Sequence, residues 1–145
     1  MTYRMIYTSE ATYQLSSEEL KGILSTSRSN NESNQITGSL VYVDGIFLQI
    51  LEGDKEAVQS LAQKIQADTR HRSFKIIYEA GSKGRLFGSW SMACIRPSAR
   101  EMSEWTKLQG TSKIDEIVAS LEARPDIIPD FVASVVKKTA TLPWF

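Results

Sequence analysis

Gln49 is a polar side chain at a position that otherwise favours apolar packing. It lies between Leu48 and Ile50 in an apolar run. A buried amide without a partner costs about 1–3 kcal/mol, so we expect a polar group to meet it. Its candidate neighbours carry a phenol or an amide: Tyr7, Asn30 and Asn31. Because each amide combines a donor with an acceptor, these groups together suit a planar ligand with hydrogen-bonding edges.

Each candidate also has an ordinary structural explanation. Tyr7 is typical of a core or edge tyrosine in a strand. The Asn30-Asn31 pair is typical of a turn after a helix. Trp90 and Met92, expected near the same site, are ordinary core residues of a last strand. Taken jointly, the set favours a binding site, although no single member requires one.

Composition excludes several kinds of catalytic and metal site. His71 is the single histidine and Cys94 the single cysteine, so we expect no Ser-His-Asp or Cys-His arrangement and no metal site. The sequence contains neither a GxGxxG motif nor a Walker loop. The polar set is therefore interpreted as a site for an organic ligand.

Length, charge and the N-terminal pattern limit the class of protein. The chain has 145 residues, enough for one domain with an appendage. Its formal net charge is zero, which gives no electrostatic reason to expect nucleic acid or an anionic membrane as partner. One cysteine allows no internal disulfide, and the N-terminus has no apolar stretch suited to a signal peptide or membrane span. We expect a cytoplasmic protein.

The segment 36–54 is predicted to be a β-hairpin that places Gln49. Asp44-Gly45 is a strong turn signal, because a type I′ turn needs positive φ at both central positions. The turn fixes the register and sets Leu40 opposite Gln49.

Two helices and three strands are predicted around this hairpin. A capping box of Ser16 and Glu19 begins the first helix. The turn formers at 29–35 are expected to end that helix at about residues 28–30. An apolar stripe after Asp54 predicts a second helix that ends near residue 68. The three strands are predicted at residues 3–9, 74–78 and 90–96.

The order β-α-β-β-α-β-β predicts an α+β fold, a ferredoxin-like sandwich. Right-handed crossovers place both helices on one face of a five-stranded mixed sheet. Residues 1–97 would form this domain. Both hairpin faces are apolar, so a C-terminal helical extension over residues 98–145 is expected to cover the second face or to pack on a partner.

Two finer expectations concern the strands. The first and third strands are predicted to be parallel neighbours, which brings Tyr7 beside Gln49. The last strand is predicted to turn Trp90, Met92 and Cys94 to one face. Whether Trp90 or Met92 points toward Gln49 stays open at this point.

The chain resembles the BLUF family, the flavin-binding sensors of blue light. The resemblance covers residues 3–96 and rests on motifs that recur in order. The matching positions are Tyr7, Asn30-Asn31, Ile36-Thr37-Gly38-x-Leu40, Gly45-x-Phe47-Leu48-Gln49-x-Leu51-Glu52-Gly53, Asp68-x-Arg70-His71 and Arg85-x-Phe87-x-x-Trp90-Ser91-Met92. Thr69 departs from the family pattern, in which many members have proline. Asn30 stands where some members have histidine.

The resemblance implies a noncovalent flavin between the two helices: FAD, with FMN or riboflavin as possibilities. Asn31 would hydrogen-bond the C2/N3 edge of the flavin, and Gln49 would sit between Tyr7 and the N5/O4 edge. Ile23 and Ile65 would sandwich the ring. Further implied contacts are Ser27, Asn30, Lys64, Arg70 and His71. The sequence leaves open whether Lys64 is instead a solvated surface charge.

The resemblance also implies a photoreceptor that turns over no substrate. Tyr7 would donate an electron and then a proton by way of Gln49, leaving a rearranged hydrogen-bond network that Trp90 and Met92 relay. No effector domain follows in this sequence, so we expect signalling through association, to a homo-oligomer or a separate signalling protein. Two alternatives remain: a ferredoxin-like binding module or enzyme without photochemistry, and a purely structural domain.

Overall fold

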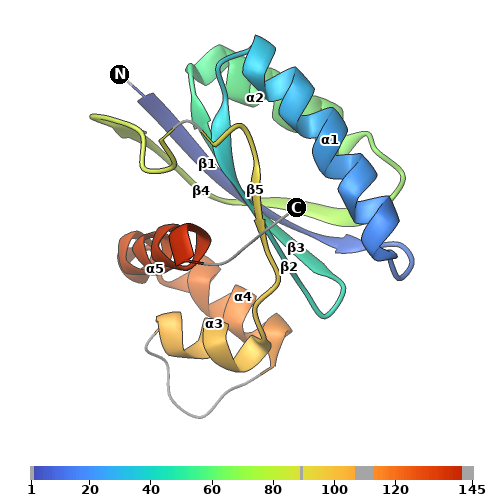
Figure 1. Ribbon diagram of the computed structural model, residues 1–145. Helices are drawn as coiled ribbons and strands as arrows, with labels where there is room; N and C mark the ends of the chain where they lie inside the picture. Colours follow the sequence, from blue (N-terminus) through green and yellow to red (C-terminus); the bar gives the residue numbers. More distant parts are fainter. Residues whose placement is uncertain (1, 89, 107–112, 142–145) are drawn as a thin grey trace.

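The computed structural model describes residues 2–88, 90–106 and 113–141, which form one sheet with helices on both faces (Figure 1). The elements in chain order are β1 (Thr2–Ala11), α1 (Ser17–Ser33), β2 (Thr37–Val43), β3 (Ile46–Gly53), α2 (Lys55–Gln66), β4 (His71–Ser82), β5 (Ala93–Ile95), α3 (Ala99–Thr106), α4 (Ile114–Ala123), the short 3₁₀ helix η1 (Pro125–Ile127) and α5 (Ile128–Thr141). The order through β5 is the predicted one. The fold is the predicted α+β, ferredoxin-like sandwich.

The five strands are arranged in the order β4-β1-β3-β2-β5, and only β2 and β5 pair in parallel. Tyr7 pairs with Gln49, but β1 and β3 run antiparallel, so the expected parallel pairing is wrong. The reason is topological. The α1 crossover makes β2 parallel to β1, and the hairpin then reverses β3, which lies between them.

The hairpin has the predicted turn and register. Asp44 and Gly45 have φ values of 50° and 78°, the positive angles that a type I′ turn needs. Leu40 lies opposite Gln49, as predicted. A two-residue turn therefore determines which residues face Gln49 across the sheet.

Helix α1 begins as predicted but ends later. Ser16 and Glu19 form the capping box. The helix continues to Ser33, so Asn30 and Asn31 lie in its last turns and not in a turn after it. Asn31 is 1% exposed and packs against the segment before β5. This tertiary contact offsets the low helix propensity of the polar stretch.

Helix α2 begins where the sequence predicts, whereas strands β4 and β5 have different bounds from the predicted ones. Asp54 is the N-cap of α2, but its side chain makes no capping hydrogen bond. Strand β4 extends beyond residues 74–78 at both ends because β1 pairs with it from Thr2 to Ala11. Strand β5 is confined to Ala93–Ile95, so Trp90 and Met92 precede it.

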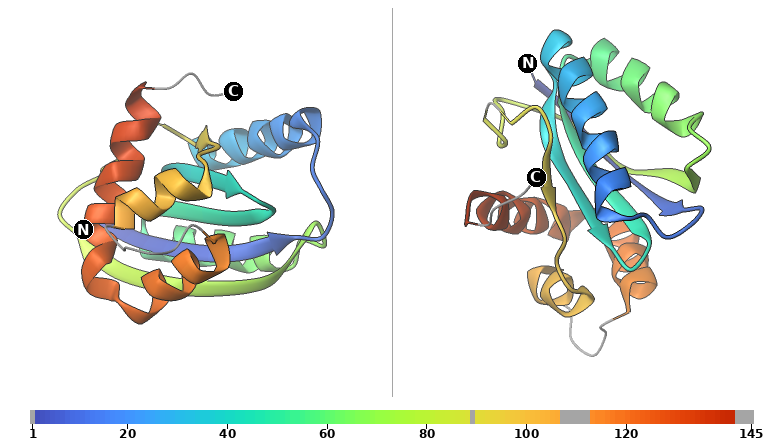
Figure 2. Two further views of the ribbon diagram at one scale, coloured as in Figure 1. Left: turned by 90° about the horizontal axis from the view of Figure 1, so that it is seen from below. Right: turned by 45° about the vertical axis from the view of Figure 1, so that its right-hand side comes forward.

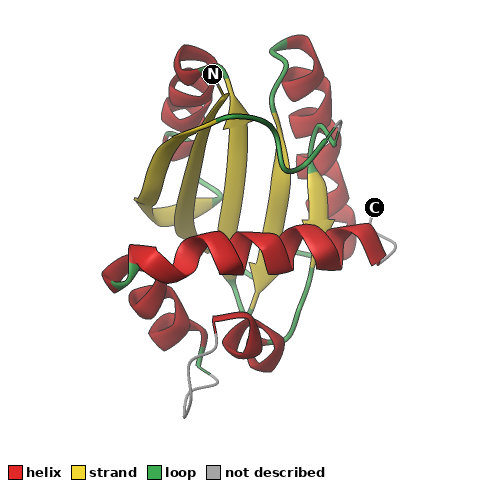
Figure 3. Cartoon of the chain, turned by 90° about the vertical axis from the view of Figure 1, so that its left-hand side faces the viewer, coloured by secondary structure: helices red, strands yellow, loops and turns green. Residues whose placement is uncertain are grey.

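The two faces of the sheet have separate hydrophobic cores. Helices α1 and α2 cover one face, called here the α1/α2 face, whose strand residues include Met5, Tyr7 and Leu40. Helices α3 to α5 cover the opposite, C-terminal face, where Leu48 and Ile50 are fully buried. Figure 2 shows the helices on either side of the sheet, and Figure 3 shows α5 crossing the strands.

A buried carboxylate on the C-terminal face fixes the loop between β4 and β5. Glu52 has no exposed surface. It accepts hydrogen bonds from Arg4 Nη2 at 3.2 Å and from Thr37 Oγ1 at 2.9 Å. The backbone N–H groups of Leu86 and Phe87 donate to it at 2.9 and 2.7 Å. The loop is thus held by charge-assisted hydrogen bonds from inside the protein.

Candidate functional site

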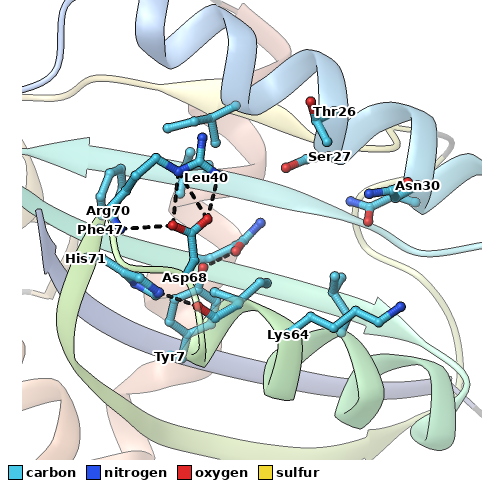
Figure 4. Close-up of a pocket in the computed structure, with 15 residues that line it drawn as sticks. Tyr7, Thr26, Ser27, Asn30, Leu40, Phe47, Lys64, Asp68, Arg70 and His71 are labelled. Carbon is cyan, nitrogen blue, oxygen red and sulfur yellow. Dashed lines mark hydrogen bonds and ion pairs between the residues drawn. The ribbon is translucent and has the colours of Figure 1, made fainter.

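A cleft with a cavity volume of about 220 Å³ lies between α1 and α2, above the sheet (Figure 4). Its lining combines aliphatic side chains with amides, hydroxyls and charged groups. The lining residues are Tyr7, Ile23, Thr26, Ser27, Asn30, Asn31, Leu40, Phe47, Gln49, Leu61, Lys64, Ile65, Asp68, Arg70 and His71. The predicted ligand-binding residues are all among them.

Tyr7 and Gln49 lie at the floor of the cleft, and Gln49 also contacts Met92, which is buried in the core next to it. The Tyr7 hydroxyl donates to Oε1 of Gln49, and Nε2 of Gln49 lies 3.2 Å from Sδ of Met92. Tyr7 and Gln49 are 4% and 5% exposed, and Met92 is fully buried. The amide that the sequence singles out therefore meets the predicted phenol on one side and a thioether on the other. A sulfur atom is a weak acceptor, so the second contact is the weaker one.

The protein surroundings keep Tyr7 protonated. Burial raises the pKa of the Tyr7 phenol well above its ordinary value, and the negative charge of Asp68 raises it further. The ring stacks on Phe74, with centroids 4.6 Å apart and planes 28° from parallel. Tyr7 is thus held in a fixed orientation with its proton directed at Gln49.

The walls of the cleft are aliphatic and come from facing helices. Ile23 belongs to α1, whereas Leu61 and Ile65 belong to α2, and all three pack partly buried against the α1/α2-face core. Leu61 and Ile65 are four residues apart and so lie on the same side of their helix. A flat ligand would meet apolar surface on both sides and polar groups at the floor.

Asn30 and Asn31 differ in position although they are neighbours. Asn31 is buried, and its Nδ2 donates to the carbonyl of Ser91 at 2.6 Å. Asn30 is exposed and lies with Lys64 at one end of the cleft, as Figure 4 shows. Asn31 is therefore the better-fixed of the two amides.

The other end of the cleft carries an ion pair and the single histidine. Arg70 Nε lies 3.0 and 3.1 Å from the two carboxylate oxygens of Asp68. Hydrogen bonding from Arg70 lowers the pKa of Asp68 to about 2. His71 Nδ1 is 2.8 Å from Ser9 Oγ, and its Nε2 contacts the backbone carbonyl of Ile65.

Trp90 and Met92 lie on opposite faces of the sheet. Met92 belongs to the core of the α1/α2 face, whereas Trp90 packs against the core of the C-terminal face. The expectation that Trp90 shares a face with Met92 and Cys94 is wrong, because residues 90–92 precede β5 and lack its strict alternation. Met92 is the residue that points toward Gln49.

Several lining residues were absent from the predicted set, and some had a detectable signal. Leu61 is four residues from Ile65 in the apolar stripe of α2. Leu40 is the hairpin partner of Gln49. Asp68 belongs to the Asp68-x-Arg70-His71 motif that carries the family resemblance, but the resemblance assigns it no ligand contact, and its place at the cleft depends on the turn between α2 and β4.

In chemical terms, the site can bind a flat, partly polar ligand and move one proton. The phenol of Tyr7 can release its proton along the existing hydrogen bond to Gln49. Among the described residues, no group of three or more His, Cys, Asp or Glu side chains is placed to hold a metal ion. The helices in that part of the chain are too short or too polar to cross a membrane.

Comparison with known proteins connects this site to light sensing. The family model described as "Sensors of blue-light using FAD" matches residues 2–93. The photoactivated adenylate cyclase subunit alpha of Euglena gracilis is 32% identical over 139 residues. That alignment covers 96% of this chain but only 12% of the relative.

Solved structures share the architecture as well. The structure titled "BlsA photo-activated state" superposes with a TM-score of 0.81 at 26% identity, covering 100% of this chain and 99% of the other. A bacterial light-regulated adenylyl cyclase gives a TM-score of 0.64 at 30% identity, covering 95% of this chain and 36% of the other.

Proposed function

The chain belongs to the BLUF family of blue-light sensors that use FAD, and on this premise we propose that light changes the hydrogen bonding of its Tyr7–Gln49 pair. The observation that carries the proposal is the bond from the Tyr7 hydroxyl to Gln49 Oε1 at the floor of the cleft. Both side chains are buried, so their hydrogen bonds are not exchanged with bulk water.

The cleft fits a flavin. Ile23 and Ile65 approach it from opposite helices and suit the two faces of a flat ring. Asn31 and Gln49 offer donors and acceptors to the polar edges of such a ring. We assign Ser27, Asn30, Lys64, Arg70 and His71 to further contacts with the flavin and its side chain, since they line the same cleft.

The proposed chemistry assigns separate roles to Tyr7, Gln49 and Met92. When bound, the flavin absorbs the blue light and supplies the electron acceptor. Tyr7 would give an electron to that acceptor and its hydroxyl proton along the bond to Gln49, and both would return to Tyr7 when the charges recombine. The Gln49 amide then presents a different end to Tyr7 and to Met92. Its two ends are nearly isosteric, so the exchange changes hydrogen bonds at little packing cost.

The signal is proposed to leave through the segment before β5 and the C-terminal helices. Met92 contacts Gln49, whereas Trp90 packs against the core that α3 to α5 cover. We treat residues 1–97 as the sensor and 98–145 as its output extension, which changes association with another copy or with a separate signalling protein. We propose that residues 1–145 act as a photoreceptor that turns over no substrate, since the described site binds a ligand and moves one proton. We also propose that the protein works in the cytoplasm.

An absorption spectrum of the purified protein, before and after blue light, tests the proposal. We expect a flavin spectrum in the dark, a shift to the red on illumination and recovery in darkness. Protein that binds flavin but does not shift would contradict the light-sensing role. Colourless protein would favour a binding module without photochemistry.

Tyr7→Phe tests the assigned donor. The variant keeps the ring that stacks on Phe74 but lacks the hydroxyl, so it should bind flavin and lose the red shift altogether. Tyr78→Phe is the matched control, because Tyr78 packs partly buried against the core of the C-terminal face. It should shift like the wild type. A normal light response in Tyr7→Phe would remove Tyr7 as the donor.

A further inference from the structure

Three consecutive backbone carbonyls before β5 each accept a hydrogen bond from another element. Gly38 N–H of β2 donates to Trp90 at 3.0 Å. Asn31 Nδ2 donates to Ser91 at 2.6 Å, and Arg28 Nε donates to Met92 at 2.8 Å. Two of the three donors come from α1, which forms one wall of the cleft. The segment 90–92 is thus fastened to the cleft wall by its backbone.

The side chains of this segment contact the cores on both faces of the sheet. Trp90 lies with the core of the C-terminal face, and Met92 lies with the core of the α1/α2 face. Met92 is also the residue whose sulfur meets Gln49 Nε2 at 3.2 Å. The placement of Sδ next to Gln49 therefore depends on the groups that hold the Met92 backbone.

A substitution at Arg28 tests the contact with Met92 without removing a cleft-lining group, whereas a substitution at Asn31 would alter both. Asn31 lines the cleft and holds Ser91 at once. Arg28 is not one of the described residues that line the cleft. Its side chain is partly buried and reaches the Met92 carbonyl beside the cleft. A substitution at Arg28 therefore removes no side chain that lines the cleft.

We propose that Arg28 is a positioning residue, which holds Met92 so that its sulfur favours the dark orientation of Gln49; this inference rests on the proposed function. In the present orientation Nε2 faces the sulfur, which accepts its hydrogen bond. If the amide turned over, Oε1 would face the same sulfur, and two acceptors would meet. A firmly held Met92 thus disfavours the turned amide and speeds its return in darkness.

Arg28→Met tests this, because it keeps an apolar stem and removes the donor. We expect unchanged flavin content and a dark recovery slowed by about threefold, the factor that corresponds to part of one hydrogen bond. Arg28→Lys keeps one donor group on a stem of similar reach and should recover at an intermediate rate. Arg96→Met is the matched control. Arg96 is exposed and also reaches α1, with Nη1 3.5 Å from Ser17 Oγ, and its loss should leave recovery unchanged.

Testing Arg28→Met in a Met92→Leu background distinguishes an effect on the position of the Met92 sulfur from a general loosening of the fold. If Arg28 acts through the Met92 sulfur, Arg28→Met should add no further slowing once that sulfur is absent. The inference would be overturned if Arg28→Met recovered at the wild-type rate, or if it slowed recovery equally in the wild-type and Met92→Leu backgrounds. It would also be overturned if Arg28→Met lost flavin while the remaining loaded protein recovered at an unchanged rate. If Arg28→Met does not fold, Arg28→Lys in both backgrounds decides by the same criterion. A flavin-loaded wild type that never shifts would overturn the proposed function, and this inference with it.

Discussion

The two faces of the sheet are both apolar, but they are covered in different ways. On the C-terminal face, Leu48 and Ile50 are fully buried in the same core as Phe131, which is itself 1% exposed. On the α1/α2 face, the covering helices leave the cleft above Tyr7 and Gln49. The hydrogen-bonded pair of Tyr7 and Gln49 thus lies on the face that its helices do not cover completely.

This difference shows where the protein uses packing and where it uses polarity. The C-terminal face also holds buried polar groups, but they serve the fold: Glu52 meets Arg4 and two backbone N–H groups of one loop. The polar pair on the α1/α2 face borders a cavity and can exchange partners with a ligand. Substitutions on the C-terminal face should therefore cost stability, and those on the α1/α2 face should mainly change ligand binding and light response.

The largest difference is expected between two carboxylates that each pair with an arginine, Glu52 on the C-terminal face and Asp68 at the cleft. Glu52→Ala should lower the free energy of unfolding by about 3–5 kcal/mol, because Arg4 is left buried without its counter-charge. Asp68→Ala should cost less than about 1 kcal/mol, since its pair with Arg70 lies at the exposed mouth of the cleft. Urea unfolding of the flavin-free proteins measures both values. Equal costs would show that the C-terminal face is no more rigidly packed than the cleft.

A smaller difference is expected between two leucines on paired strands. Leu48→Ala, on the C-terminal face, should cost about 4 kcal/mol, because the surrounding side chains cannot fill the space. Leu40→Ala should cost about 2 kcal/mol, because Leu40 already borders the cleft. The same urea experiment measures both. Added FAD should stabilise the Leu40 variant less than it stabilises the wild type, and a larger cost at Leu40 than at Leu48 would contradict the comparison.

Much of the site could be predicted because short-range rules determine it. The Asp44-Gly45 turn fixes the hairpin register, and the register places Leu40 opposite Gln49. The pairing of Tyr7 with Gln49 was predicted as well, although the strand direction was not. Local turn chemistry specifies neighbours across a hairpin, whereas the direction of more distant strands depends on the whole topology.

The parts that could not be predicted depend on contacts between distant segments. The extension of α1 past Asn31 follows from its bond to Ser91, sixty positions along the chain. The opposite placement of Trp90 and Met92 follows from a segment that lies outside β5. The bond from Arg28 to a backbone carbonyl has no sequence signal, because any residue supplies that carbonyl.

The smallest expected effect concerns alkaline pH and also separates the two faces. Burial raises the pKa of Cys94, in the core of the α1/α2 face, from 9.0 to about 11. The folded protein therefore keeps a proton that the unfolded chain loses above pH 9, so stability should fall between pH 9 and 11. Tyr7, whose pKa is also raised by burial, acts in the same direction. The Cys94 contribution to this fall should be on the order of 1–2 kcal/mol.

Cys94→Ala isolates this contribution. The variant should be less stable at neutral pH because a buried side chain is shortened, but its stability should fall less steeply between pH 9 and 11. The slope against pH is the informative quantity, since it does not depend on the packing loss. Val132→Ala, in the core of the C-terminal face, is the control: it removes buried apolar atoms without a titrating group and should keep the wild-type slope. If Cys94→Ala falls as steeply as the wild type, the buried thiol does not make the α1/α2 face sensitive to alkali.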